Sequence, residues 1–481
     1  MPRTKKKSKK IEDILLRKKE TIWKKASKKE MDEIFNYAEG YKEFMKFAKT
    51  ERETATKVVE IARKYGFREI SEYKTLHPGD RIYEVNKEKM VLLAVAGKKS
   101  IETGMNIVCA HLDAPRLDLK QLPLYEDSET EIALFKTHYY GGIKKYQWVA
   151  FPLALHGVII TKDGKKVNIT IGEKPGEPVF IIPDLLPHLA KNVQGERKLL
   201  DGIKGEELNI IVGSIPVKDE DVKSKVKVAV LEYLNKEYGI VEEDFVSAEL
   251  EAVPAISPVD SGFDKSFVLA YGQDDRVCVY SALTALLSLD KPEKWCMAVF
   301  YDKEEIGSAG NTSATSYFLE NFVGRLCALV SETHSGCDVK DVLERSKAIS
   351  ADVDAGVDPT YKEVHDINNA AKMGCGVALT KYTGVGGKYG ANDAHAEYMG
   401  KIRQIFNDAG VAWQSAELGK VDEGGGGTVS KYLAIYNMDI VDCGPPVLSM
   451  HAPLEVVSKA DLYHSHLAYQ AFYKNMDSGE A

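Results

Sequence analysis

The sequence has few of the features that mark secreted, membrane-spanning or nucleotide-using proteins. Seven cysteines lie scattered through 481 residues, and an odd, dispersed set without a CxxC pair predicts neither a disulfide framework nor a thiolate metal site. No apolar run approaches the ~20 residues that a membrane helix needs, so we expect no membrane association. The chain also lacks a GxSxG nucleophile elbow and a P-loop GKS motif, which disfavours serine hydrolysis and nucleotide chemistry.

The charge balance is mildly acidic, with 64 Lys and Arg against 72 Asp and Glu and a net charge of −8. This balance argues against nucleic acid as a partner. The first ten residues are basic, but the sequence Ile11-Glu12-Asp13 follows them instead of an apolar core, so they do not resemble a signal peptide. We therefore interpret residues 1–10 as a solvated cationic tail and expect a cytoplasmic protein.

The apolar pattern predicts an α/β fold with an insertion. Hydrophobic residues make up 44% of the chain, enough for a sizeable core, and the length suggests two or three domains. Helical spacing covers 11–65, short buried strands follow at 91–96 and 106–110, and β-branched alternation with turns covers about 118–252. We predict a catalytic domain formed by 1–116 and 254–481, with a mixed sheet, interrupted by a β-rich domain at 117–253.

Strands and helices alternate after residue 265, which favours a parallel or mixed sheet with crossover helices. The predicted strands are 266–271, 295–301, 326–331 and 348–351, and the predicted helices are 276–289 and 313–323.

Ionisable residues follow several of these strands directly. The residues are His111 and Asp113, Asp274 and Asp275, Glu304 and Glu305, Asp352 and Asp354, and finally His451. Ligands of open α/β sheets bind beyond the carboxyl ends of the strands, so we expect these side chains to meet in one crevice.

Imidazole and carboxylate ligands suit zinc, and manganese or cobalt would suit them too. A pair of metals about 3.5–4 Å apart needs a bridging carboxylate. In the pattern His-x-Asp, the ring binds metal while the acid two residues later orients the ring. Adjacent glutamates divide the work, because one binds metal while the other stays free as a general base.

Five segments resemble the M18 aminopeptidases, over about residues 40–475 and including the insertion. They are AHLDAP (110–115), QDDR (273–276), DKEEIGS (302–308), SAD (350–352) and MHAPLE (450–455). The resemblance implies a zinc-peptidase-like fold and a dinuclear metalloaminopeptidase that hydrolyses peptides with a free N-terminus.

The resemblance also implies residue roles. Asp274 would bridge two zinc ions, with Asp275 as its rival. His111 and Asp352 would complete one metal, and Glu305 and His451 the other. Glu304 would be the general base acting on a metal-bridging water, and Asp113 the partner of the His111 ring.

In this family a histidine from the insertion of one subunit enters its neighbour's active site. The segment 187–192 resembles that region, so His188 is the candidate, and an ordinary surface histidine is the alternative. The resemblance further implies dimers formed through the insertion and a tetrahedral homododecamer with an interior chamber.

Two departures from the family leave the substrate preference open. After Asp352 the chain reads Val-Asp-Ala-Gly (353–356) where animal members have Met-Ala-His-Ala, and Lys388 stands in a region where they carry Lys-Gln-Arg-Tyr. Lys388 would neutralise an acidic first residue, so the aspartyl preference is one of two outcomes.

Other interpretations remain at this point. One is an M42-like aminopeptidase or M20-like dipeptidase, and another is a non-catalytic oligomeric scaffold with the same fold. His334 and His395 are rival ligands that do not follow a strand in the right order. We expect His464 and His466 to be exposed on a C-terminal helix, and Cys109 to be a buried apolar residue.

Overall fold

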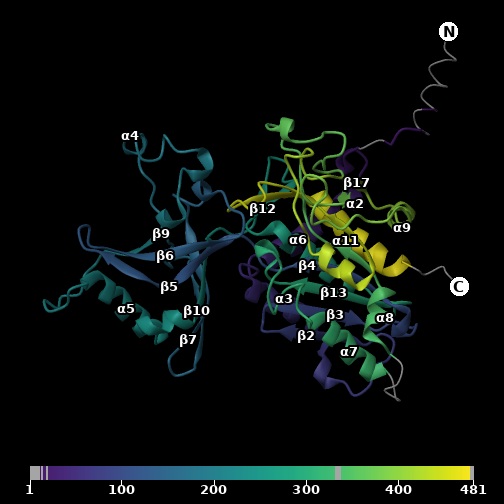
Figure 1. The fold of residues 1–481 in the computed structure, drawn as a ribbon, viewed down its shortest axis with the longest axis horizontal. Helices are drawn as coiled ribbons and strands as arrows, with labels where there is room; N and C mark the ends of the chain where they lie inside the picture. Colours follow the sequence, from purple (N-terminus) through teal and green to yellow (C-terminus); the bar gives the residue numbers. More distant parts are fainter. Residues whose placement is uncertain (1–10, 12–14, 18–19, 331–336, 477–481) are drawn as a thin grey trace, which may run out of the picture.

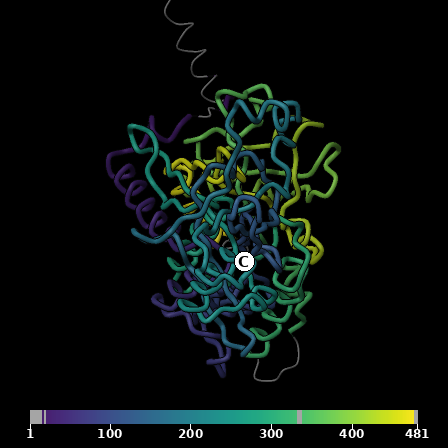
Figure 2. Tube along the Cα trace, turned by 90° about the vertical axis from the view of Figure 1, so that its left-hand side faces the viewer, coloured from purple at the N-terminus to yellow at the C-terminus, as the bar shows by residue number. Residues whose placement is uncertain are grey.

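The computed structural model describes residues 11, 15–17, 20–330 and 337–476, so the basic tail at 1–10 lies outside the described residues. The chain forms a larger lobe with a sheet flanked by helices and a smaller lobe with a sheet of its own (Figure 1). Figure 2 views the molecule from the side of the smaller lobe. Within the described residues, every helix is too short or too polar to cross a membrane.

The larger lobe is built on a mixed sheet with the order β1-β2-β3-β13-β4-β14-β18-β16-β17. Strands β13, β4, β14 and β18 are parallel. Strand β3 is antiparallel to both of its neighbours, whereas β16 is antiparallel to β18 and parallel to β17. The strands are β1 (Arg68–Glu69), β2 (Arg81–Asn86), β3 (Met90–Val95), β4 (Met105–His111), β13 (Trp295–Tyr301), β14 (Lys347–Ser350), β16 (Val377–Thr380), β17 (Trp413–Ser415) and β18 (Asp439–Gly444).

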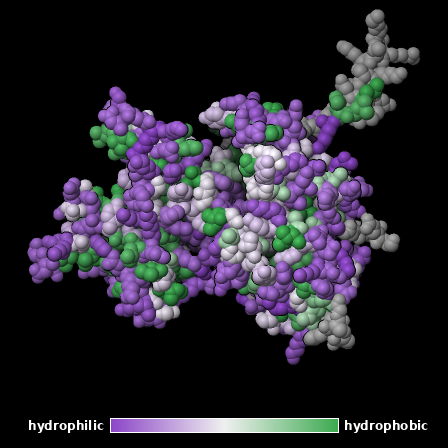
Figure 3. Space-filling view, viewed as in Figure 1, coloured by the Kyte–Doolittle hydropathy of each residue, from purple (hydrophilic) through white to green (hydrophobic). Residues whose placement is uncertain are grey.

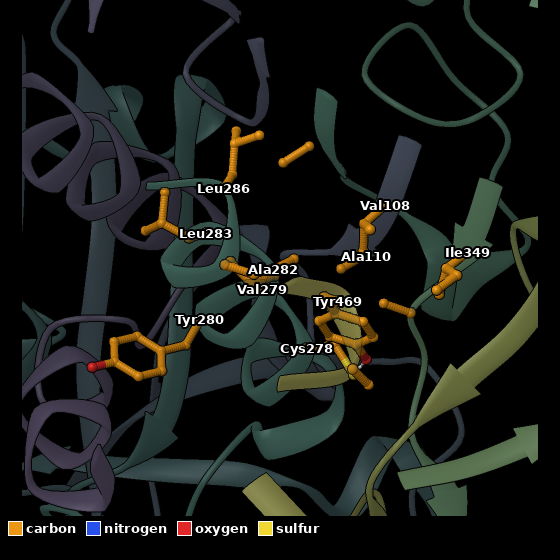
Figure 4. Close-up of a cluster of buried hydrophobic side chains, with 14 of the residues drawn as sticks. Val108, Ala110, Cys278, Val279, Tyr280, Ala282, Leu283, Leu286, Ile349 and Tyr469 are labelled. Atoms are coloured by element: carbon orange, nitrogen blue, oxygen red, sulfur yellow. Dashed lines mark hydrogen bonds between the residues drawn. The ribbon is translucent and has the colours of Figure 1, made fainter. Parts of the chain in front are cut away.

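Helices cover both faces of this sheet, which explains why its central strands are apolar along their whole length. Along β3, Val91 and Leu93 belong to one hydrophobic cluster, while Leu92 and Ala94 belong to the other. The first cluster includes residues of α6 (Gln273–Leu287) and α11 (Lys459–Asn475), and Figure 4 shows Val108 of β4 in the same cluster as α6 residues such as Ala282. The predicted α/β class with a mixed sheet is confirmed.

Two helices of this lobe, α2 (Lys28–Met45) and α3 (Glu51–Lys64), begin with side-chain caps. The side chain of Ser27 accepts a hydrogen bond from the backbone N–H of Glu30, and Thr50 does the same for Glu53. The helices are α2 (Lys28–Met45), α3 (Glu51–Lys64), α6 (Gln273–Leu287), α7 (Phe318–Val330), α8 (Val339–Glu344), α9 (Ala396–Asp408), α10 (Ser430–Leu433) and α11 (Lys459–Asn475).

The smaller lobe is antiparallel, with the strand order β8-β7-β10-β5-β6-β9. Its strands are β5 (Arg116–Asp127), β6 (Ile132–Tyr140), β7 (Leu153–Ile160), β8 (Lys166–Ile171), β9 (Asn209–Gly213) and β10 (Ala248–Pro254), and its helices are α4 (Pro187–Ala190) and α5 (Lys225–Tyr238). A separate core fills this lobe, with Phe135 and Leu250 among its buried residues.

A third, small sheet has the order β11-β12-β20-β19-β15. Its strands are β11 (Val259–Ser261), β12 (Phe267–Ala270), β15 (Asp354–Ala355), β19 (Pro446–Leu448) and β20 (Glu455–Ser458). The strand predicted at 266–271 therefore exists, but it belongs to this sheet and not to the central one.

Three expectations from the sequence are wrong. Residues 326–330 continue helix α7 and form no strand, because Leu319, Phe322, Val323 and Leu326 make one apolar helix face. We expected His464 and His466 to be exposed, and neither is. His464 is only 3% exposed, and His466 is partly buried and packs against the ring of Tyr37.

The cysteines behave largely as their scatter predicts. Cys109 is buried in β4 with a free thiol, as expected. A disulfide joins Cys327 to Cys337, a single link that the sequence did not indicate.

Candidate metal centre

The residues expected in the crevice come together at one end of the central sheet. His111 is the last residue of β4. Glu304 and Glu305 form the 3₁₀ turn η8 (Glu304–Ile306) that follows β13, the parallel neighbour of β4. Asp352 follows β14 on the other side of β4. The carboxyl ends of parallel neighbours share one sheet edge, so these side chains meet there.

Asp274 and His451 reach the same place from the small sheet. Asp274 lies in the first turn of α6, after β12, and His451 follows β19. A cavity of about 400 Å³ lies at this place. Asp274 and His451 line it, together with His111, Glu304, Glu305 and Asp352.

The carboxylate of Asp274 lies between two imidazole rings. Its Oδ1 is 3.2 Å from Nε2 of His111, and its Oδ2 is 3.3 Å from Nε2 of His451. Nε2 of His451 is also 3.4 Å from Oε2 of Glu305, and Nε2 of His111 is 4.0 Å from Oδ1 of Asp352. The neighbouring carboxylate of Asp275 instead accepts the backbone N–H of His111 at 3.2 Å.

The donor set fits a pair of metal ions. His111 forms one possible ligand group with Asp274 and Glu305, and a second with Asp275 and Asp352. Among the described residues, Oε1 of Glu305 is buried and has no hydrogen-bond partner, and Oδ1 of Asp274 is buried with no donor in hydrogen-bond geometry despite the 3.2 Å approach of Nε2 of His111. Buried acceptors without a donor are costly, and cations would satisfy them. Nitrogen and carboxylate oxygen are ligands that zinc accepts.

The imidazole rings and carboxylates of this cluster shift one another's pKa values strongly. Burial lowers the pKa of His451, but the carboxylates of Asp274 and Glu305 outweigh burial and raise it to about 10. Burial is likewise outweighed at His111, whose pKa Asp113 and Asp274 hold well above its usual value. Burial also opposes ionisation of Asp274, yet the two rings keep its pKa below the usual range. Metal ions would replace the protons on the rings, as metal binding generally does.

Glu304 differs from its neighbour in ways that suit a base. Burial, together with the charges of Asp113 and Asp274, raises the pKa of Glu304 to about 7. Burial, together with the charge of Asp274, also raises the pKa of Glu305 well above its usual value, but Glu305 faces His451 as a possible metal ligand. A carboxyl group that titrates near neutral pH is well matched to accept and return a proton.

Asp113 organises the turn that carries both glutamates. Its carboxylate accepts the backbone N–H of Glu304 at 3.1 Å and of Glu305 at 3.2 Å. Its backbone carbonyl is 3.0 Å from Nδ1 of His111, whereas the nearest carboxylate oxygen is 3.4 Å away. The contact with the ring therefore involves the main chain of Asp113 as well as its acid.

Two other expected site residues lie elsewhere within the chain. Lys388 does not line the cavity; its Nζ pairs with Asp393 at 2.9 Å and lies over the ring of Tyr382. His188 lies in α4, at the far end of the smaller lobe in Figure 1. Of the rival ligands, His395 precedes α9 and does not line the cavity, and His334 lies outside the described residues.

The structure adds site residues that the sequence reasoning missed. Glu455 is buried on β20, where its carboxylate accepts the backbone N–H of His451 at 2.7 Å and of Asp274 at 3.0 Å. The signal for it was its place four residues after His451 in one motif. Asp442 and Lys431 also line the cavity, as does Asp354, which the sequence had placed in the crevice.

Comparison with known proteins identifies the relatives of this chain. A family model described as "Aminopeptidase I zinc metalloprotease (M18)" matches residues 44–473. A "Probable M18 family aminopeptidase 1" from Borreliella afzelii is 48% identical over 95% of this chain and all of its own length. One with the same name from Clostridium acetobutylicum is 47% identical over 96% of this chain and 99% of its own.

Solved structures agree with this similarity. An M18 aminopeptidase from Thermotoga maritima is 47% identical, with a TM-score of 0.89, and the match covers 95% of this chain and 99% of that one. Aminopeptidase I from Clostridium acetobutylicum is 43% identical, with a TM-score of 0.88, over 96% of this chain and 100% of that one. The mApe1 dodecamer of Saccharomyces cerevisiae is 20% identical, with a TM-score of 0.72, over 91% of this chain and 96% of that one.

Proposed function

Because the chain belongs to the M18 family of zinc metalloaminopeptidases, we propose that it is a two-metal enzyme that removes the first residue from peptides with a free N-terminus. The observation that supports this most strongly is the carboxylate of Asp274, held between His111 and His451. A carboxylate whose two oxygens each face a different imidazole is well placed to be shared by two metal ions, each of which would bind one of the rings.

The proposed ligands divide between two ions. Asp274 would be shared by both ions, His111 and Asp352 would complete one set, and Glu305 and His451 would complete the other. When bound, two zinc ions would polarise the scissile carbonyl group and favour ionisation of the attacking water. Manganese or cobalt would suit the same ligands.

Glu304 moves the proton in this proposal. It accepts a proton from water as the water oxygen attacks the carbonyl carbon of the first peptide bond. It then returns that proton to the nitrogen of the leaving amine as the carbon–nitrogen bond breaks. In the metal-free protein, burial together with the charges of Asp113 and Asp274 raises the pKa of Glu304 to about 7, which supports its role in exchanging a proton. Asp113 keeps the Glu304 backbone in place through the 3.1 Å hydrogen bond.

Acidic groups around the site account for cleavage at chain ends. A free α-amino group is cationic near neutral pH, and the carboxylates at the site attract it. An acylated N-terminus has no such charge, so it is a poor substrate.

The lining of the cavity favours neutral or basic first residues over acidic ones. Lys388, the cation expected to neutralise an acidic side chain, pairs with Asp393 outside the cavity. Lys431 does line the cavity, but so do the carboxyl groups of Asp354 and Asp442. An aspartyl side chain would meet more acids than cations there.

Hydrolysis of aminoacyl-p-nitroanilides tests this function. The panel contains Asp, Glu, Leu, Lys and Ala, with chelated protein and N-acetyl-Leu-p-nitroanilide as controls. We expect metal-dependent release from Leu, Lys and Ala, slower release from Asp and Glu, and none from the acetylated compound. Fastest release from Asp or Glu would restore the acidic preference, and no release from any free-amine compound would refute the aminopeptidase.

We also propose that 117–253 is an inserted domain through which subunits associate. Exposed apolar residues gather near α4 (Figure 3), and they are Leu185, Leu186, Leu189, Val193, Leu199 and Leu200. Apolar patches of this kind mark association surfaces. The dodecamer of the yeast relative supports dimers that assemble into a dodecamer here, with His188 entering the neighbour's site.

We also propose a cytoplasmic setting, because four buried cysteines, namely Cys109, Cys278, Cys296 and Cys443, take part in no disulfide, although Cys327 is joined to Cys337.

A further inference from the structure

One short segment of the smaller lobe contacts both sides of the proposed metal site. It contacts the carboxylate of Asp113 beside His111, and it contacts the ring of His451 directly. The segment consists of Tyr140, the last residue of β6, followed by Gly141 and Gly142. The segment belongs to the smaller lobe, yet it contacts Asp113 and His451 at the metal site of the larger lobe.

Tyr140 reaches the His111 side of the site. Its hydroxyl group donates a 2.8 Å hydrogen bond to Oδ2 of Asp113. The same Oδ2 accepts the backbone N–H of Glu305, and Oδ1 accepts that of Glu304. The Tyr140 hydroxyl thus fixes the carboxylate that orders both glutamates and lies beside the His111 ring.

Gly142 reaches the His451 side. Its backbone carbonyl oxygen is 2.9 Å from Nδ1 of His451, so it can accept the proton of that ring nitrogen and leave Nε2 facing Asp274. Gly141, between them, packs closely, since a Cβ there would lie 3.4 Å from Cβ of Glu305. The segment is therefore confined from both ends.

A buried cation holds Tyr140 in turn. The guanidinium carbon of Arg116 lies 3.9 Å from the centre of the Tyr140 ring. Arg116 is 5% exposed and forms ion pairs with Asp118 at 2.8 Å, with Glu251 of β10 at 3.0 Å and with Glu51 of α3 at 3.5 Å. Because α3 belongs to the larger lobe and β10 to the smaller one, Arg116 also joins the two lobes.

From these contacts we propose that Tyr140 is a positioning residue through which the smaller lobe holds the metal site in shape. It acts through Asp113 on Glu304, Glu305 and His111, while Gly142 supports His451. This inference rests on the proposed two-metal function. Partners behind the ligands of metal sites typically change metal affinity by about 10- to 100-fold when they are removed.

The variant Tyr140→Phe tests the inference, because it removes the hydroxyl group and keeps the ring beside Arg116. Tyr139→Phe is the matched control, since Tyr139 is the preceding residue of β6 and is 42% exposed. Zinc affinity is measured by competition with a chelating indicator, and melting temperatures are measured with and without zinc. Steady-state kinetics on Leu-p-nitroanilide give kcat and KM separately.

We expect Tyr140→Phe to bind zinc about 10- to 100-fold more weakly than the parent protein and to show a smaller zinc-induced rise in melting temperature. Its kcat should fall while KM stays within about twofold, and Tyr139→Phe should match the parent.

A merely structural role would lower the melting temperature of Tyr140→Phe with and without zinc alike. Unchanged zinc affinity and an unchanged zinc-induced rise would therefore overturn the inference, even if the variant were less stable. A parent protein that binds no zinc would refute the proposed two-metal function itself, which separates the two failures.

Discussion

Nε2 of His451 lies 3.3 Å from Oδ2 of Asp274. The other oxygen of the same carboxylate lies 3.2 Å from His111, a residue 340 positions earlier in the chain than His451 (451 − 111). The small sheet supplies Asp274 and His451, and the central sheet supplies His111. The proposed bridging position thus depends on the two sheets being packed together.

Removal of the Asp274 charge should therefore affect both ions. We expect Asp274→Asn to lose both zinc ions and Asp352→Asn to lose one, because only Asp274 faces both histidines. Bound zinc per subunit, measured by atomic spectroscopy after dialysis, checks this, with the exposed Asp290→Asn as control. Two zinc ions retained by Asp274→Asn would shift the bridging role to Asp275.

Glu304→Gln should separate catalysis from metal binding. The amide cannot accept a proton, so we expect kcat to fall by about 10²- to 10⁴-fold while zinc content stays at the parent value. Glu293→Gln, at an exposed ion pair with Lys98, is the control. Full activity in Glu304→Gln would refute the proposed mechanism, and an inactive parent with intact zinc would favour the scaffold interpretation.

His188 should act on the neighbouring subunit. We expect His188→Ala to lose activity while its oligomeric state, measured by light scattering, stays the same. Co-expression of His188→Ala with Glu304→Gln should then restore activity, because a site with intact Glu304 receives His188 from the other variant. If His188→Ala is as active as the parent, or if the mixed oligomers stay inactive, the proposal that two subunits share an active site is wrong.

His466 should make stability depend on pH. Burial lowers its pKa to about 4, and Nδ1 lies 2.9 Å from the hydroxyl group of Thr284. Unfolding restores a pKa near ~6.5, so the unfolded chain takes up a proton first as the pH falls. The free energy of unfolding should therefore drop between pH 6.5 and 4 by up to ~1.4 kcal/mol per pH unit from this residue.

Urea unfolding of metal-free protein measures this dependence. We expect His466→Gln to show a shallower slope than the parent below pH 6.5, and a difference between the two proteins that is constant above pH 7. Equal slopes in both proteins would contradict the burial effect.

The sequence predicts the core of the candidate site well because its motifs lie directly after apolar strands. His111 ends a strand whose residues are buried on both faces, and Glu304 follows the parallel neighbour of that strand. A run of buried strand followed by acids is a local pattern, and the sheet edge brings such patterns together.

Features that depend on packing between distant segments could not be predicted in this way. The run at 326–330 is too short and apolar to distinguish a strand from a buried helix face. His464 lies on α11, yet the backbone N–H of Ala412 donates to its Nδ1 at 3.0 Å and α2 brings Glu30 close. The contact of Tyr140 with Asp113 likewise exists only because the two lobes meet.

A zinc titration of metal-free protein tests the central claim most directly. Bound zinc and the hydrolysis of Leu-p-nitroanilide are followed in the same samples as zinc is added. The account predicts that activity is absent without metal, rises with zinc and saturates at two ions per subunit. Activity that persists in zinc-free, chelated protein would contradict it. Activity that reaches its maximum while no zinc is bound would contradict it too.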